Sequence, residues 1–293
     1  ATQVNAVLGG INGAVRALGG RESTSVNILI GIVLSVFVLL VLLGGAKRIG
    51  FAASFLVPFA SVFYIALCVG VLILRAQAIP IAIASILKGA FYPRAVTGGI
   101  VGSAFQALRI GTSRGVFTNE AGMGTASIAH GAADVTHPVK QGLMGVLEVF
   151  IDTIVICTLT ALVILCSGIK IPYGLSDGAT LTVDAFKYSL GTWVNVPLSI
   201  AVCLFAVATI FGWSLYGIRC AQFLFGEASW WVYILLQIVI VAISALIDTT
   251  AIWQFSEALN GLMLIPNLIA LLLLSPVFIK LLKEFNCSRK ITG

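Results

Sequence analysis

The residues best suited to chemistry lie in one polar stretch between apolar segments, from Gly111 to His130 (GTSRGVFTNEAGMGTASIAH). It contains Arg114, Asn119 and Glu120, with four glycines and five hydroxyl side chains. In a bilayer, irregular polar backbone is tolerated only where it is buried in protein or lines a cavity. Unwound backbone exposes carbonyl oxygens for a cation and a half-helix N-terminus for a carboxylate. The stretch is therefore predicted to be the broken middle of a membrane helix and part of a binding site; the alternative is a polar loop between two separate helices.

Two further carboxylates, Glu148 and Asp152, are four residues apart and are expected to share one helix face. Burying each in lipid costs ~2.5 kcal/mol or more, so each needs a partner or a wet cavity. The pair could bind a cation or a proton. Alternatively, it is a solvated pair with helix-packing partners.

Thr209 and Trp213 are also four residues apart and are expected on one helix face. A threonine hydroxyl can ligate a hard cation or hydrogen-bond a substrate, and a tryptophan can wall a small pocket. Both types also serve as packing residues in membrane helices. His130 and His137 have no metal-ligand spacing and are interpreted as interfacial. No nucleophile, metal or phosphate-loop motif of an enzyme is present in the sequence.

The composition indicates what must position these residues. Of the 293 residues, 59% are hydrophobic and 10% are charged, with a mean hydropathy of +1.09. A soluble domain carries about 25% charged residues, so this chain is predicted to be an all-α integral membrane protein. The apolar runs have helix length, ~20 residues, rather than the ~10-residue alternation of a membrane barrel. The net charge of +6 comes mainly from short loops, so nucleic-acid binding is not predicted.

Seven membrane spans are expected, and the third is discontinuous near Phe117–Gly124, because a straight helix of that length, ~50 Å, exceeds the ~30 Å hydrocarbon core. Residues 1–24 are interpreted as the end of a helix and a loop, 76–95 as an interfacial or re-entrant segment, and 168–190 as a long polar loop. The expected spans are Val26–Gly45, Phe51–Leu74, Thr97–Ala129, Gly142–Ser167, Trp193–Gly217, Trp230–Ile247 and Ala251–Leu282.

Several segments resemble the alanine/glycine:cation symporter family, the sodium:alanine symporters. They are RGVFTNEAGMGTASIAHGAADVTHPVKQGL, EVFIDTIVICTLTALVILCSG, LLGGAKRIGFAASFLVPF, LFAVATIFGWSLYG and NGLMLIPNLIALLLLS. The resemblance extends over nearly the whole chain and implies a leucine-transporter-like fold of two inverted five-helix repeats. The seven spans are then core helices four to ten of one transporter domain, 1–293, that lacks its N-terminal helices.

The resemblance also implies roles for individual residues. Gln3 and Asn5 match a QxN motif where the family is expected to contact substrate. Thr209 and Trp213 are expected on core helix eight, facing the substrate and sodium sites, with Thr209 as an ion ligand. The expected substrate contacts also include four residues of the broken helix: Phe117, Thr118, Asn119 and Gly122. Three carboxylates are candidates for ion or proton coupling: Glu120, Glu148 and Asp152.

Two positions depart from the family pattern and bear on ion coupling. Ala208 stands where the family usually has serine, which removes one potential sodium-ligating hydroxyl, and Ile218 stands where an acidic residue is frequent. The expected function is Na⁺-coupled uptake of alanine or glycine by a monomer in the plasma membrane, with no cofactor besides the coupling ion. Proton-coupled uptake and a non-transporting amino-acid sensor are the alternatives.

Overall fold

The computed structural model describes residues 1–21, 23–91, 100–120, 122–171, 178–246 and 249–292. Within these ranges the chain is helical and contains no strand. The α-helices are α1 (Thr2–Ala17), α2 (Thr24–Leu42), α3 (Gly45–Leu74), α4 (Ile79–Phe91), α5 (Ile100–Asn119), α6 (Thr125–His130), α7 (Pro138–Val149), α8 (Thr158–Ser167), α9 (Gly178–Leu190), α10 (Asn195–Phe225), α11 (Ser229–Ile243) and α12 (Thr249–Thr292). Short 3₁₀ turns are η1 (Ala76–Ala78), η4 (Thr192–Val194) and η5 (Ser244–Leu246), and a π-helix, η3 (Phe150–Cys157), joins α7 to α8.

Six helical segments in the described part of the chain are long and apolar enough to cross a membrane. They match six of the seven expected spans and confirm an all-α integral membrane fold: Thr24–Leu42, Gly45–Leu74, Pro138–Ser167, Thr192–Phe225, Ser229–Leu246 and Phe255–Cys287. Two helices continue beyond the ends of the expected spans: α10 extends to Phe225 rather than Gly217, and α12 extends to Thr292 rather than Leu282. The short apolar helix over Ala76–Gly89 agrees with a segment too short to span.

The remaining expected span, 97–129, is not among the six. Residues 97–99 and 121 lie outside the described residues, and α5 carries Arg109 and Arg114, which lower its hydropathy. The predicted break is confirmed: α5 ends at Asn119 and α6 begins at Thr125. Between them the backbone is left-handed at Glu120 (φ 49°), Gly122 (φ 77°) and Gly124 (φ 86°). Such φ values end an α-helix, and glycine adopts them without a Cβ penalty.

The prediction of a long polar loop over 168–190 was wrong for its second half, where α9 forms. Val183, Phe186 and Leu190 are spaced three and four residues apart, which puts them on one helix face. Phe186 is fully buried there, in a core shared with α3, α8 and α10. The polar residues that suggested a loop, such as Asp184 and Lys187, lie on the exposed side. Residues 172–177 of the expected loop lie outside the described residues.

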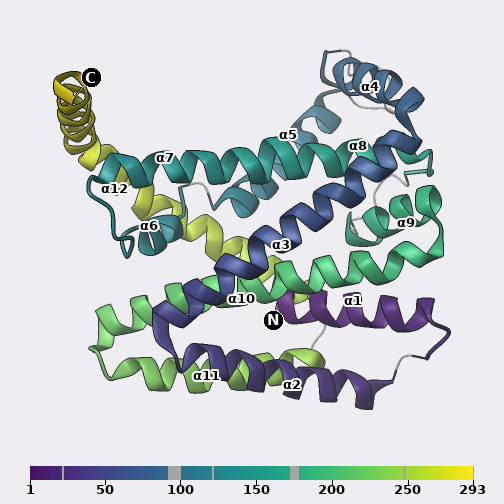
Figure 1. Ribbon diagram of the computed structural model, residues 1–293, viewed down its shortest axis with the longest axis horizontal. Helices are drawn as coiled ribbons and strands as arrows, with labels where there is room; N and C mark the ends of the chain where they lie inside the picture. Colours follow the sequence, from purple (N-terminus) through teal and green to yellow (C-terminus); the bar gives the residue numbers. More distant parts are fainter. Residues whose placement is uncertain (22, 92–99, 121, 172–177, 247–248, 293) are drawn as a thin grey trace. The chain divides into compact units, whose positions relative to one another are not determined.

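The chain divides into two compact units, unit 1 (residues 1–95 and 156–252) and unit 2 (residues 96–155 and 253–293). In unit 1, α1, α2, α10 and α11 share one hydrophobic core, and α3, α8, α9 and α10 share another. α10 therefore contributes to both. Figure 1 shows α1 lying along α10 and α2 along α11.

Small residues allow these helices of unit 1 to approach closely, as is typical of membrane helix packing. An added Cβ at Gly10 of α1 would lie 3.3 Å from the Ser199 carbonyl oxygen of α10. An added Cβ at Gly31 of α2 would lie 2.9 Å from the Cβ of Ala245. The close approach at Gly10 holds α1 against α10, and the cavity described below lies beside these two helices.

Candidate functional site

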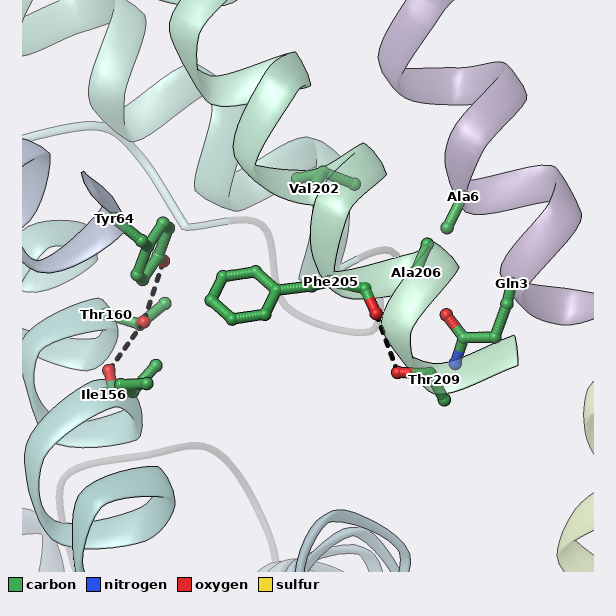
Figure 2. Close-up of a pocket in the computed structure, with 9 residues that line it drawn as sticks. All are labelled: Gln3, Ala6, Tyr64, Ile156, Thr160, Val202, Phe205, Ala206 and Thr209. Atoms are coloured by element: carbon green, nitrogen blue, oxygen red, sulfur yellow. Dashed lines mark hydrogen bonds between the residues drawn. The ribbon is translucent and has the colours of Figure 1, made fainter. Parts of the chain in front are cut away.

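A cavity of about 290 Å³ lies within unit 1, between α10 on one side and α1, α3, η3 and α8 on the others (Figure 2). One continuous face of α10 lines it, because residues 202, 205, 206 and 209 follow the i, i+3, i+4, i+7 spacing of a helix face. The lining residues are Gln3, Ala6, Tyr64, Ile156, Thr160, Val202, Phe205, Ala206 and Thr209. None of these side chains carries a charge at neutral pH.

Gln3 and Thr209, both predicted to contact substrate, line this cavity together. Figure 2 shows the Gln3 amide beside Thr209 at one end of the cavity. The Thr209 hydroxyl donates to the Phe205 carbonyl oxygen, one turn earlier, at 2.9 Å. A carbonyl oxygen can only accept, so the threonine oxygen keeps its lone pairs as acceptors. Gln3 offers both amide donors and an acceptor.

Trp213, predicted to share the face of Thr209, is on α10 as expected but is not among the described residues that line the cavity. Its ring packs edge-on against Tyr216, with the ring centroids 5.8 Å apart. Ala208 also does not line the cavity. The role predicted for Trp213 as a substrate contact stays a prediction.

The opposite end of the cavity is formed by Tyr64 of α3 and Thr160 of α8, which sequence reasoning missed. Their hydroxyl oxygens are 2.8 Å apart, and Thr160 Oγ1 also lies 2.8 Å from the Ile156 carbonyl oxygen. The two residues are 96 positions apart in sequence. The signal in the sequence that could find Thr160 is the set of threonines at 153, 158 and 160, which is typical of a polar stripe but does not identify Tyr64 as a partner.

In unit 2, the predicted residues of the broken helix are held by side-chain links. Asn119 accepts a hydrogen bond from Thr153 of the π-helix η3. The Thr125 hydroxyl donates to the Glu120 carboxylate across the break, at 2.5 Å. The Asn267 amide of α12 donates to the Gly122 carbonyl oxygen at 2.8 Å. These links attach the end of α5 to η3 and the break itself to α12, and one of them closes the break internally.

The segment of α5 before the break packs on α12 through aromatic and charged groups. The rings of Phe117 and Trp253 have centroids 5.2 Å apart. Arg114 lies over the same tryptophan ring, 5.2 Å from its centroid, and forms an ion pair with Glu257 at 3.0 Å. Thr118, predicted as a substrate contact, is exposed within the described structure.

The three carboxylates predicted for coupling have different surroundings. Glu120 bonds to Thr125. Glu148 lies 3.4 Å from His130, whose other ring nitrogen is 2.7 Å from the Gln141 amide. His130 is therefore a partner for Glu148, which the sequence did not predict.

Asp152 differs from the other two carboxylates. Its Oδ2 atom is buried, and no described residue hydrogen-bonds to it. It also lies in the π-helix η3, so the regular α-helical spacing from Glu148 assumed for the pair does not hold there. π-helical turns frequently occur at functional sites. No group of three His, Cys, Asp or Glu side chains that could hold a metal is found among the described residues.

Six helical segments of membrane length define the class of this molecule: a multi-pass integral membrane protein. The chain belongs to the sodium:alanine symporter family, whose family model matches residues 1–292. This match confirms the resemblance seen in the sequence. It also confirms the predictions that the chain belongs to a family of transporters rather than of enzymes and to the plasma membrane.

Three curated relatives cover most of this chain. The sodium/alanine symporter AgcS of Methanococcus maripaludis is 39% identical over 90% of this chain and 58% of its own length. The amino-acid carrier protein AlsT of Bacillus subtilis is 35% identical over 99% of this chain and 60% of its own. The probable sodium/glutamine symporter GlnT of Bacillus subtilis is 34% identical over 90% of this chain and 55% of its own. The chain thus spans between 55% and 60% of the length of these relatives.

Proposed function

We propose that the whole protein is a secondary active symporter that couples Na⁺ entry to the uptake of a small neutral amino acid, alanine or glycine, by alternating access. The observation that carries this proposal is the cavity of unit 1, in which Gln3 and Thr209 lie together among uncharged side chains. Membership of the sodium:alanine symporter family and the printed names of the relatives support the same activity.

The lining of the cavity suits a neutral amino acid rather than an acidic or basic one. An extra charge on the ligand would be buried without an opposite charge among the described lining residues, which costs several kcal/mol. A zwitterion carries no net charge, so its two ionic groups can be satisfied by dipoles. The Gln3 amide can donate to the carboxylate, and the acceptor oxygens of Gln3 and Thr209 can receive the ammonium. A volume of about 290 Å³ is at the small end for ligand pockets.

Sodium binding is proposed at Thr209, because a hydroxyl oxygen with free lone pairs is a suitable ligand for a hard cation. The Thr209 proton is donated to the Phe205 carbonyl, which leaves those lone pairs available. Ala208 contributes no hydroxyl, so further oxygen ligands would have to come from elsewhere in the protein. Within unit 2, Phe117, Thr118, Asn119 and Gly122 remain proposed substrate contacts.

The test is uptake of labelled alanine by the whole protein reconstituted in liposomes. With an inward Na⁺ gradient, accumulation above the equilibrium level is expected, and replacing Na⁺ with choline should abolish it. Equal accumulation with choline would contradict sodium coupling. Alanine binding without flux under any gradient would instead indicate a sensor.

Proton coupling is the second candidate, and the unpartnered oxygen of Asp152 is the observation that favours it. A carboxylate inside a membrane span without a partner is costly unless it takes up a proton or an ion. If protons are coupled, an inward pH gradient should drive alanine uptake without Na⁺, and Asp152→Asn should remove that component. Glu120 and Glu148 are weaker candidates because each already has a partner.

A further inference from the structure

The cavity of unit 1 has two polar ends, and the second one has no counterpart in the predicted site. Gln3 and Thr209 form the first end, and Tyr64 and Thr160 form the second. In Figure 2 the Phe205 side chain lies between the two ends. An amino acid held by its ionic groups at the first end would therefore direct its side chain toward Phe205 and the second end.

The hydrogen-bond pattern fixes what the second end can offer a ligand. Thr160 Oγ1 is 2.8 Å from the Ile156 carbonyl oxygen, which can only accept, so the single hydroxyl proton of Thr160 is donated there. The Tyr64 hydroxyl lies 2.8 Å from Thr160 Oγ1 and also hydrogen-bonds with the buried Cys68, so its proton is donated to one of these two partners. Both protons are thus committed within the protein. The second end presents lone pairs alone, and a ligand there must bring the donor.

We propose that Tyr64 and Thr160 determine specificity by accepting a hydrogen bond from the side chain of the bound amino acid. This inference rests on the proposed function and deepens it, because it names a side-chain class that the same cavity accepts besides alanine. A terminal carboxamide, as in glutamine, brings the required N–H donors. A carboxylate of the same length brings none and faces lone pairs, and a thioether of similar length brings no donor either.

Phe205 sets how long a side chain must be to reach the second end. Its ring packs edge-on against the Tyr64 ring, with centroids 6.1 Å apart, and Tyr64 also packs on the buried Phe186 at 5.9 Å. Tyr64 is therefore held in place by aromatic contacts as well as by its hydrogen bond. Because the Phe205 side chain lies between the two ends, an alanine bound at the first end does not contact Tyr64 or Thr160.

The experiment compares inhibitors of Na⁺-driven alanine uptake by the whole protein in liposomes. Glutamine, methionine and glutamate have side chains of similar length and differ in the terminal group. In the wild-type protein, glutamine should inhibit alanine uptake at least about fivefold more strongly than methionine, because that factor corresponds to the free energy of one hydrogen bond. Glutamate should not inhibit alanine uptake. Tyr64→Phe keeps both ring contacts and should reduce the preference for glutamine over methionine to nearly one, as should Thr160→Val. The quantity compared is the ratio of inhibition by glutamine to inhibition by methionine, measured against the alanine uptake of each variant.

Two matched substitutions serve as controls. Thr158→Val makes the same change on α8 at an exposed position, and Tyr188→Phe makes the same change on α9; neither residue lines this cavity. Both should keep the wild-type preference. A glutamine preference that is absent in the wild type, or unchanged in Tyr64→Phe and Thr160→Val, would overturn the inference while leaving alanine transport intact. Failure of the proposed function would appear differently, as absent alanine uptake in the wild-type protein.

Discussion

The two units of this chain are stabilised in different ways. Unit 1 contains both hydrophobic cores and a cavity whose described lining residues are all uncharged. In unit 2, the described residues that are buried are few: Met123, Thr125 and Asn260. Its helices are joined instead by polar links, such as the Arg114–Glu257 ion pair and the hydrogen bond from Asn267 to the break. Apolar packing therefore dominates one unit, and specific polar pairs dominate the other.

Under the proposed function, this difference separates two tasks of a symporter. A neutral ligand needs dipoles in a pocket, and we propose that the cavity of unit 1 offers them through Gln3 and Thr209. Intramembrane carboxylates that exchange partners are costly and are characteristic of ion and proton pathways, and those predicted for coupling lie in unit 2. On this proposal, substitutions in unit 1 are expected to change ligand and sodium affinity. In unit 2, substitutions of the four proposed substrate contacts should also change ligand affinity, and substitutions elsewhere should change stability or coupling.

The largest effect is expected from Thr209→Val in unit 1. The substitution keeps the shape of the side chain and removes the oxygen proposed to ligate Na⁺. Losing an interaction with a charged group costs about 1.5–3 kcal/mol, so the Na⁺ concentration for half-maximal alanine uptake should rise at least tenfold. Thr158→Val on α8 is the matched control and should behave as the wild type. An unchanged sodium dependence in Thr209→Val would place sodium binding away from this residue.

A smaller effect on stability is expected at the Arg114–Glu257 pair of unit 2. Arg114→Met leaves the Glu257 carboxylate unpaired in an apolar segment, which should cost about 2 kcal/mol. Glu257→Gln should have a comparable effect. The double variant removes both charges and should recover most of the lost stability, measured as the apparent melting temperature in detergent. If the two single losses simply add, the pair is not coupled and polar links do not stabilise unit 2 as described.

The smallest effects concern the glycines around the break. Gly124 has φ 86°, and an added Cβ would lie 2.8 Å from Asn267 Oδ1, so Gly124→Ala should destabilise by about 1–2 kcal/mol. Gly115 lies inside α5 with open space around it, so Gly115→Ala should stabilise by up to about 1 kcal/mol. Thermal unfolding of the two variants side by side distinguishes a required left-handed turn from a general intolerance of alanine in this segment.

Much of this architecture could be predicted because lipid imposes simple rules on sequence. Six spans followed from apolar length, and the break at 120–124 followed from glycines and charges within an overlong segment. α9 was missed because polar residues are interleaved with the apolar ones that anchor it, and its burial depends on partners distant in sequence. The Tyr64–Thr160 pair was missed for the same reason. The π-helix at Asp152 could not be predicted from a 3.6-residue period, and the inverted-repeat relationship stays a prediction.

The most direct test of the account is equilibrium binding of labelled alanine to the whole protein carrying Gln3→Ala. Among the described polar residues that line the cavity, Gln3 is the one that keeps free N–H donors for a carboxylate. A hydrogen bond to a charged group contributes about 1.5–3 kcal/mol, so the dissociation constant for alanine should rise at least tenfold at saturating Na⁺. The same constant in Gly115→Ala should match the wild type. Wild-type affinity in Gln3→Ala would contradict the assignment of the unit 1 cavity as the amino-acid site.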